Sequence, residues 1–238
     1  MHNMGDITAV VLCGGLGTRL RSVSSDRPKP MVDVAGRPFL EYILDYLIEQ
    51  GVTKAVLAVS YKKEVIIEHF GNQYKSLSLS YSEESTPLGT GGAVNKSIHQ
   101  LVGHPDQLAL VINGDTLVEY QLGDMLSDLN KNNADLVMSL KAMEDTSRYG
   151  RVNVNNRNVT QFEEKKGGVP GLINAGVYLF NTHLQDEFPR QETFSFENDV
   201  LENLVHTHRV LASVTNGYFI DIGVPDDFNK AQVDLGER

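Results

Sequence analysis

Short apolar segments alternate with segments of helical periodicity along the first half of the chain. The apolar segments have the length of buried strands, and they cover residues 7–12, 54–61, 77–81 and 108–113. The segments that repeat apolar residues every three or four positions cover residues 39–51, 63–71 and 92–101. Two of these helices end at a glycine, which is a common helix stop. The alternation predicts an α/β fold with a mostly parallel central sheet and helices on both faces.

The pattern changes after residue 134, where strands follow one another with little helix between them. We expect strands at 134–142, 150–154, 159–165, 174–180, 209–215 and 218–223. We expect helices at 196–207 and 225–235, the second with Pro225 at its first position. No repeat, low-complexity tract or linker interrupts the sequence. We therefore expect one domain over residues 1–238, with a β-rich half from about residue 135.

The composition disfavours several classes of function. The chain carries 31 acidic and 21 basic residues, a net charge of −10, which disfavours a surface that follows a nucleic-acid backbone. No apolar run approaches the roughly 18 residues of a membrane span, and the N-terminus lacks a signal-peptide pattern. The one cysteine, Cys13, ends an apolar strand, which favours burial over a nucleophilic role. We expect a cytoplasmic protein that binds neither nucleic acid nor a membrane.

The first strand runs directly into glycines and cations, in the sequence VVLCGGLGTRLRSVSSDRPKPM at residues 10–31. Glycines let consecutive backbone N–H groups converge on an anion, and Arg19 and Lys29 add positive charge. The spacing differs from that of a P-loop. It matches only half of the dinucleotide fingerprint. Gly15 and Gly17 fit the pattern, but Leu20 occupies the third glycine position, and Ser60–Tyr61 stand where an acidic residue is expected. The loop predicts a phosphate site and disfavours a nicotinamide-dependent oxidoreductase.

GGLGTRL followed by KPM resembles the signature of the sugar-1-phosphate nucleotidyltransferases, also called nucleotide-sugar pyrophosphorylases. Further blocks resemble this family in its own order: TPLGTGGA (86–93), NGD (113–115), YGRV (149–152), EEKK (163–166), NAGVYLF (174–180) and DIGVPDDF (221–228). The resemblance implies a Rossmann-like, GT-A-like nucleotidyltransferase fold and Mg²⁺ as cofactor. It also implies nucleotidyl transfer from a nucleoside triphosphate to a sugar 1-phosphate, with residues 1–134 as the nucleotide-binding half and residues 135–238 as the sugar-binding half.

Two segments, RLRSVSSDRPKPM and YSEESTPLGTGGA, resemble the guanylyltransferases that act on D-glycero-D-manno-heptose 1-phosphate. The resemblance implies GTP and this heptose 1-phosphate as substrates, GDP-heptose for a bacterial capsule, lipopolysaccharide or S-layer glycan as product, and a homodimer. A mannose-1-phosphate guanylyltransferase and a uridylyl- or thymidylyltransferase of the same family are the alternatives. A non-catalytic regulatory homologue should have lost one of four charged residues that are all present: Arg19, Lys29, Asp115 and Asp221.

The reaction needs positioning and charge neutralisation more than covalent chemistry from the protein. We expect the glycine-loop amides to hold the triphosphate, and Arg19 and Lys29 to stabilise the charge on the leaving pyrophosphate. Asp115 and Asp221 each end or follow a strand, and the resemblance assigns both to Mg²⁺, with Asp115 also catalytic. The expected nucleotide-binding residues are Leu12, Gly14, Gly15, Gly17, Thr18, Glu84, Leu88, Gly89, Thr90 and Gly114.

Guanine offers two adjacent donors, N1–H and the 2-amino group, and one carboxylate can accept both, whereas uracil and thymine offer a single N3–H. Glu84 is placed for this contact if its side chain points inward, and Glu83 is the competitor. Backbone groups of residues 88–90 would read the remaining base edge.

On the sugar side, Gly150 can offer an N–H and Asn174 a two-way hydrogen-bonding amide. The resemblance assigns hydroxyl binding to Glu164 and binding of the sugar phosphate to Lys165.

Overall fold

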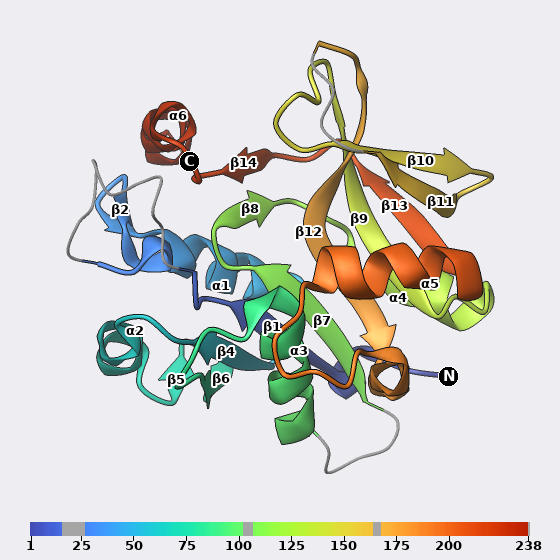
Figure 1. Ribbon diagram of the computed structural model, residues 1–238. Coiled ribbons are helices and arrows are strands. Elements are labelled where there is room, and N and C mark those ends of the chain that lie inside the picture. The colour runs from blue at the N-terminus through green and yellow to red at the C-terminus, as the bar shows by residue number, and fades with distance from the viewer. Residues whose placement is uncertain (16–26, 102–106, 164–167, 238) are drawn as a thin grey trace.

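The computed structural model describes residues 1–15, 27–101, 107–163 and 168–237. Its centre is a ten-stranded sheet with the order β10-β11-β13-β9-β12-β7-β1-β4-β6-β5 (Figure 1). The strands of this sheet are β1 (Ile7–Leu12), β4 (Lys54–Val59), β5 (Gln73–Tyr74), β6 (Leu77–Glu83), β7 (Leu108–Asn113), β9 (Leu136–Met143), β10 (Arg151–Asn155), β11 (Asn158–Glu163), β12 (Gly171–Asn181) and β13 (Val210–Thr215). Two separate two-stranded sheets pair β2 (Asp33–Val34) with β3 (Arg37–Pro38), and β8 (Thr116–Val118) with β14 (Phe219–Asp221).

Helices cover both faces of this sheet. They are α1 (Phe39–Glu49), α2 (Lys63–Phe70), α3 (Gly89–Leu101), α4 (Leu122–Lys131), α5 (Glu202–Thr207) and α6 (Pro225–Gly236). Short 3-10 turns cover Met4–Asp6, Lys29–Met31 and Thr182–Glu187, and a π-helical segment covers Phe196–Leu201.

Strand direction follows the expectation of a mostly parallel sheet. Strand β1 pairs in parallel with β4 and β7, β6 with β4, and β13 with β9. Strands β5, β11 and β12 run opposite to the other seven strands of the sheet. The predicted fold class is therefore confirmed, with the antiparallel strands concentrated in the second half of the chain.

The alternation of side chains along β1 divides the core into two layers. Ile7, Ala9 and Val11 belong to a buried cluster that contains residues of α1, α2, α4 and α6, whereas Val10 belongs to a second cluster with residues of α3 and α5. Figure 1 shows α3 and α5 on the same side of the sheet. Both faces of the central strands are thus covered, which explains why they read as continuous apolar runs.

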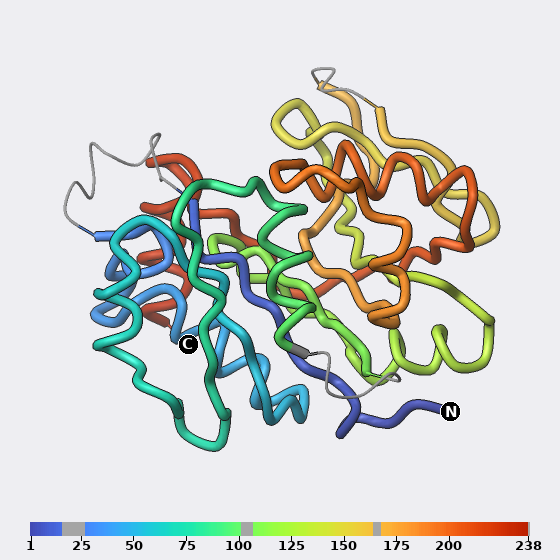
Figure 2. Tube along the Cα trace, turned by 60° about the horizontal axis from the view of Figure 1, so that its bottom comes forward, coloured from blue at the N-terminus to red at the C-terminus, as the bar shows by residue number. Residues whose placement is uncertain are grey.

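The two halves of the chain are interleaved at the C-terminus. Strand β14 pairs with β8, and the Gln232 side chain accepts a hydrogen bond from the Ala35 amide and donates one to the Asp33 carbonyl, at 2.8 and 2.7 Å. Figure 2 shows the red C-terminal segment beside the blue and cyan N-terminal part. Residues 219–236 therefore pack against the first half, and the division into a nucleotide half and a sugar half stays a prediction.

Several elements differ from the sequence expectation, among them three helical ones. Helix α3 begins at Gly89 rather than at residue 92. Gly91 and Gly92 have poor helix propensity, so the sequence does not indicate a helix there, but their small size lets the start of the helix pack closely against the segment around Phe194. The region 196–207 starts with a π-helical segment before α5. Helix α4 was not predicted, although four of its apolar residues have helical spacing and are buried: Leu122, Met125, Leu126 and Leu129.

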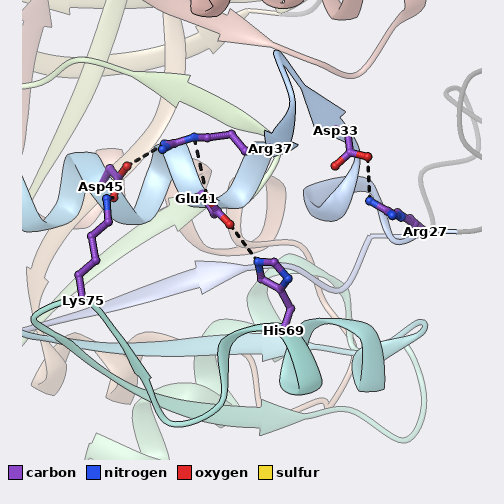
Figure 3. Close-up of polar contacts among 7 residues, drawn as sticks. All are labelled: Arg27, Asp33, Arg37, Glu41, Asp45, His69 and Lys75. Atoms are coloured by element: carbon purple, nitrogen blue, oxygen red, sulfur yellow. Dashed lines mark hydrogen bonds and ion pairs between the residues drawn. The ribbon is translucent and has the colours of Figure 1, made fainter.

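Charged side chains fasten the surface of α1 to the neighbouring elements (Figure 3). Asp45 accepts hydrogen bonds from Arg37 at 2.7 Å and from Lys75 at 2.5 Å, and Glu41 contacts His69 of α2 at 2.9 Å. These contacts hold α1 against the neighbouring elements of the first half of the chain.

The carboxyl ends of β1, β4, β6 and β7 lie at one edge of the sheet because these strands are parallel. In open α/β sheets this edge is where ligands bind. Within the described part of the chain, no helix has both the length and the apolar character needed to cross a bilayer.

Candidate functional site

A cavity of about 320 Å³ opens at the carboxyl edge of the parallel strands. It is lined by residues that follow β1, β6 and β7, by the start of α3, and by one residue of the π-helical segment. They are Leu12, Gly14, Gly15, Lys29, Pro30, Glu84, Pro87, Gly89, Thr90, Ala93, Asn113, Asp115 and Glu197. Most of the residues predicted to bind a nucleotide are therefore brought together here. Gly17, Thr18 and Arg19 were also predicted, and they lie outside the described residues.

The glycines at the strand ends allow backbone and carboxylate to approach closely. A Cβ on Gly14 would lie 3.2 Å from Oε1 of Glu84. The Gly114 amide donates to the Leu12 carbonyl at 3.0 Å, and a Cβ on Gly114 would lie 2.5 Å from that oxygen. Gly114 thus joins the ends of β1 and β7, and it presents the next residue, Asp115, to the cavity.

Asp115, Asp221 and Lys29 form a charge cluster, of which Lys29 and Asp115 line the cavity. The Lys29 ammonium contacts Asp115 at 2.5 Å and lies 3.7 Å from Asp221. The pairing of β14 with β8 places Asp221 opposite Thr116, and the Ile222 amide donates to the Asp115 carbonyl at 3.1 Å. The two carboxylates predicted to share a site, although distant in sequence, do meet.

Burial and the neighbouring Asp115 carboxylate raise the pKa of Asp221, while Lys29, the Gly223 amide and Arg148 lower it in part. Burial is the larger of the two raising effects, and the like charge of Asp115 adds to it. Among the described residues no group of three acidic, histidine or cysteine side chains gathers, but Mg²⁺ usually takes one or two carboxylates together with phosphate oxygens. The pair therefore fits a magnesium ion that arrives with a nucleotide.

Glu84 and Glu83, which the sequence could not separate, point in different directions. Glu84 is buried, and its Oε2 accepts a hydrogen bond from the Leu88 amide at 3.0 Å. Burial raises the pKa of Glu84, an effect that the Leu88 amide and Lys96 reduce. Glu83 instead forms an exposed ion pair with Lys63 at 2.7 Å. Only Glu84 lines the cavity.

The segment 88–90 is fastened to a part of the chain that sequence reasoning did not connect with the site. The Leu88 carbonyl accepts from the Phe194 amide at 3.1 Å, and Gly91 donates to the Phe194 carbonyl at 2.9 Å. Gly89 has a φ of 71°, and a Cβ there would lie 2.5 Å from the Phe194 carbonyl oxygen. The close approach that requires a glycine at this position is therefore one to the chain's own backbone.

A second cavity of about 600 Å³ lies against the antiparallel strands of the second half. Its lining is Tyr149, Gly150, Arg151, Val152, Phe162, Glu163, Asn174, Glu197, Asn198 and Glu202. Gly150 and Asn174, both predicted to bind the sugar phosphate, are among them, whereas Glu164 and Lys165 lie outside the described residues. The Asn174 amide donates to the Tyr178 hydroxyl at 2.7 Å, and its oxygen accepts from the Gly176 amide at 3.0 Å, so the side chain also stabilises the irregular pairing of β9 with β12.

Two residues near these cavities were missed by the sequence analysis. Glu197 lines both cavities, and Arg148 lies 3.9 Å from Asp221 while it pairs with Asp227. Glu197 falls in the first turn of the segment that reads as a helix, where an acidic residue is ordinary, so no local signal distinguishes it.

The comparisons with known proteins agree with this geometry. A family model described as Nucleotidyl transferase matches residues 8–238. The D-glycero-alpha-D-manno-heptose 1-phosphate guanylyltransferase of Campylobacter jejuni subsp. jejuni serotype O:2 is 44% identical over 221 residues, 92% of this chain and 96% of the relative. The protein of that name from Aneurinibacillus thermoaerophilus is 42% identical over 227 residues, 95% of this chain and 97% of the relative. The crystal structure of HddC from Yersinia pseudotuberculosis complexed with GMP-PN has a TM-score of 0.83 and 38% identity, and the alignment covers 96% of this chain and 99% of that one.

Proposed function

The chain belongs to the nucleotidyl transferase family, and from this membership we propose that it transfers a guanylyl group from GTP to D-glycero-α-D-manno-heptose 1-phosphate. The family, the nucleotidyltransferase fold and the enzyme class expected from the sequence motifs are confirmed. The observation that carries the proposal is a buried carboxylate, Glu84, in the wall of a cavity that Lys29 and Asp115 also line, with Asp221 within 3.7 Å of the Lys29 ammonium. The names of two relatives more than 40% identical support the same substrates.

In this reaction a phosphate oxygen of the sugar 1-phosphate attacks the α-phosphorus of GTP, the bond from that phosphorus to the bridging oxygen breaks, and pyrophosphate leaves. We assign the amides of Gly14, Gly15, Gly17 and Thr18 to the triphosphate. Lys29 and Arg19 neutralise the charge that grows on the leaving group. Mg²⁺, held by Asp115 and Asp221 when it is bound, supplies further charge neutralisation at the phosphates.

The base is selected by hydrogen bonding. Glu84 can accept N1–H and the 2-amino group of guanine, with Leu12 and residues 88–90 surrounding the base. Its burial strengthens this selection, because a carboxylate without a partner in a buried site is costly and a base with one donor would leave part of it unsatisfied.

We place the sugar 1-phosphate in the second cavity. Gly150, Asn174 and Glu164 form hydrogen bonds with its hydroxyl groups, and Lys165 binds its phosphate. The two cavities share Glu197, so a ligand in each would be adjacent. A cytoplasmic location and a homodimer stay predictions, and light scattering on the purified protein tests the second.

A pyrophosphate-release assay tests the function. Four nucleoside triphosphates are crossed with heptose, mannose and glucose 1-phosphates, with and without Mg²⁺. We expect release with GTP and the heptose 1-phosphate in the presence of Mg²⁺. Faster turnover of mannose 1-phosphate would overturn the sugar assignment, and release with UTP or dTTP alone would overturn the assignment of Glu84.

A further inference from the structure

Glu197 stands in the wall between the two cavities, and its backbone is rigidly held. Ser195 caps the π-helical segment, since its side chain accepts from the Asn198 amide at 3.2 Å and its amide donates to Asp199 at 2.7 Å. Phe196 is fully buried and stacks on Phe180 at 5.9 Å between ring centroids. The segment therefore presents Glu197 from a fixed support.

Hydrogen bonds also fix the direction of the Glu197 carboxylate. The Thr90 hydroxyl accepts from the Phe196 amide at 2.9 Å, so its single proton is free to point at Oε2 of Glu197, 2.6 Å away. The Ser195 hydroxyl donates to the same oxygen at 3.1 Å. In the described part of the chain no donor reaches the other oxygen, Oε1. One oxygen is anchored, and the second remains as an acceptor in the cavity wall.

A carboxylate can only accept hydrogen bonds, so the group that meets Oε1 must be a donor. The phosphates of both substrates are negatively charged and would be repelled. The hydroxyl groups of the sugar are donors, and the second cavity, which Glu197 lines, also holds the sugar-site residues Gly150 and Asn174.

We propose that Glu197 is a specificity-determining residue that accepts a hydroxyl of the sugar 1-phosphate on Oε1. Its anchor on Thr90 links the sugar site to the segment that surrounds the nucleotide. This proposal rests on the proposed function for the nature of the ligand in the second cavity.

Steady-state kinetics of Glu197→Gln tests the role, because glutamine keeps the shape but removes the charge. We expect KM for the sugar 1-phosphate to rise about 10- to 100-fold, because a hydrogen bond to a charged group is lost. KM for GTP should stay within about twofold of the wild-type value. Glu202→Gln is the matched control, since Glu202 lines the same cavity but is exposed, and it should change KM for the sugar less than about threefold.

Two outcomes would overturn the proposal. Equal effects of the two substitutions would mean a general charge effect, and a rise in KM for GTP alone would place a ribose hydroxyl on Glu197. Direct titration of GTP into Glu197→Gln shows that the variant folds and keeps its nucleotide site. If the wild type prefers another sugar 1-phosphate, the proposed substrate fails, and the same comparison with that sugar still decides the role of Glu197.

Discussion

Replacing Lys29 with methionine tests the charge cluster at the phosphate end of the cavity. Methionine keeps an aliphatic stem but removes the ammonium that contacts Asp115 at 2.5 Å and lies 3.7 Å from Asp221. The two carboxylates then lack the cation that separates them, and the pKa of Asp221 loses an influence that lowers it against burial and Asp115. We expect stability and activity to fall together.

The exposure of the three side chains sets the size of the effect. Removing one partner of a fully buried ion pair costs about 3–5 kcal/mol, and an exposed pair contributes about 0–1 kcal/mol. Lys29 is 11% exposed, but Asp115 is 37% and Asp221 is 23% exposed, so water screens part of the loss. An intermediate cost of about 2 kcal/mol lowers Tm by about 4–8 °C in a chain of this length. The loss of one preorganised charge should lower kcat/KM about 10²- to 10³-fold.

Thermal unfolding and pyrophosphate release, each with and without Mg²⁺, measure both effects. Lys63→Met is the matched control, because it breaks a surface pair with Glu83 at 2.7 Å and should leave both Tm and turnover nearly unchanged. Mg²⁺ can neutralise the two carboxylates, so it should raise the Tm of Lys29→Met more than that of the wild type. Equal Tm and equal kcat/KM in the two methionine variants would refute the reasoning.

Two further substitutions probe the base site and the segment beside it. Glu84→Gln should reduce the preference for GTP over UTP in kcat/KM about 10- to 100-fold, and an unchanged preference would contradict the assignment. Because burial raises the pKa of Glu84, the native state holds this proton more tightly than the unfolded chain, and wild-type stability falls as pH rises from about 4.3 through the raised pKa. The Tm difference in favour of Glu84→Gln should grow over that range, and a constant difference would argue against it. Gly89→Ala should lower Tm by at least about 4 °C, since φ is 71° and its Cβ would lie 2.5 Å from the Phe194 carbonyl oxygen. Gly123→Ala, whose Cβ meets nothing within 4 Å, should leave Tm unchanged or higher, so equal losses would exclude the strain argument.

Most strands and helices could be predicted because their signals are local. The apolar run at 7–12 and the helical spacing of 39–49 can be recognised from neighbouring residues alone, and both were observed as β1 and α1. At the start of α3, packing overrode propensity. Helix α3 begins with three glycines in its first four residues, a poor local sequence for a helix, because the start of the helix must touch the backbone around Phe194.

The site divides in the same way. The glycine loop, Lys29 and Asp115 were predicted as site residues because they stand in motifs that resemble the family, and the structure places Gly14, Gly15, Lys29 and Asp115 at one cavity. Glu197 could not, since its function depends on a hydroxyl from Thr90, a residue that is distant in the sequence and adjacent only in the fold.

The sequence by itself determined the alternation of elements, the kinds of chemical group available and the family. The tertiary structure alone decided which of two adjacent glutamates faces the cavity, that Asp221 meets Asp115 across β8 and β14, and that Glu197 borders both cavities. The physical reason is one of range. Periodicity and turn chemistry act over a few residues, whereas side-chain direction and the meeting of distant charges depend on strand register and on the burial of a shared core.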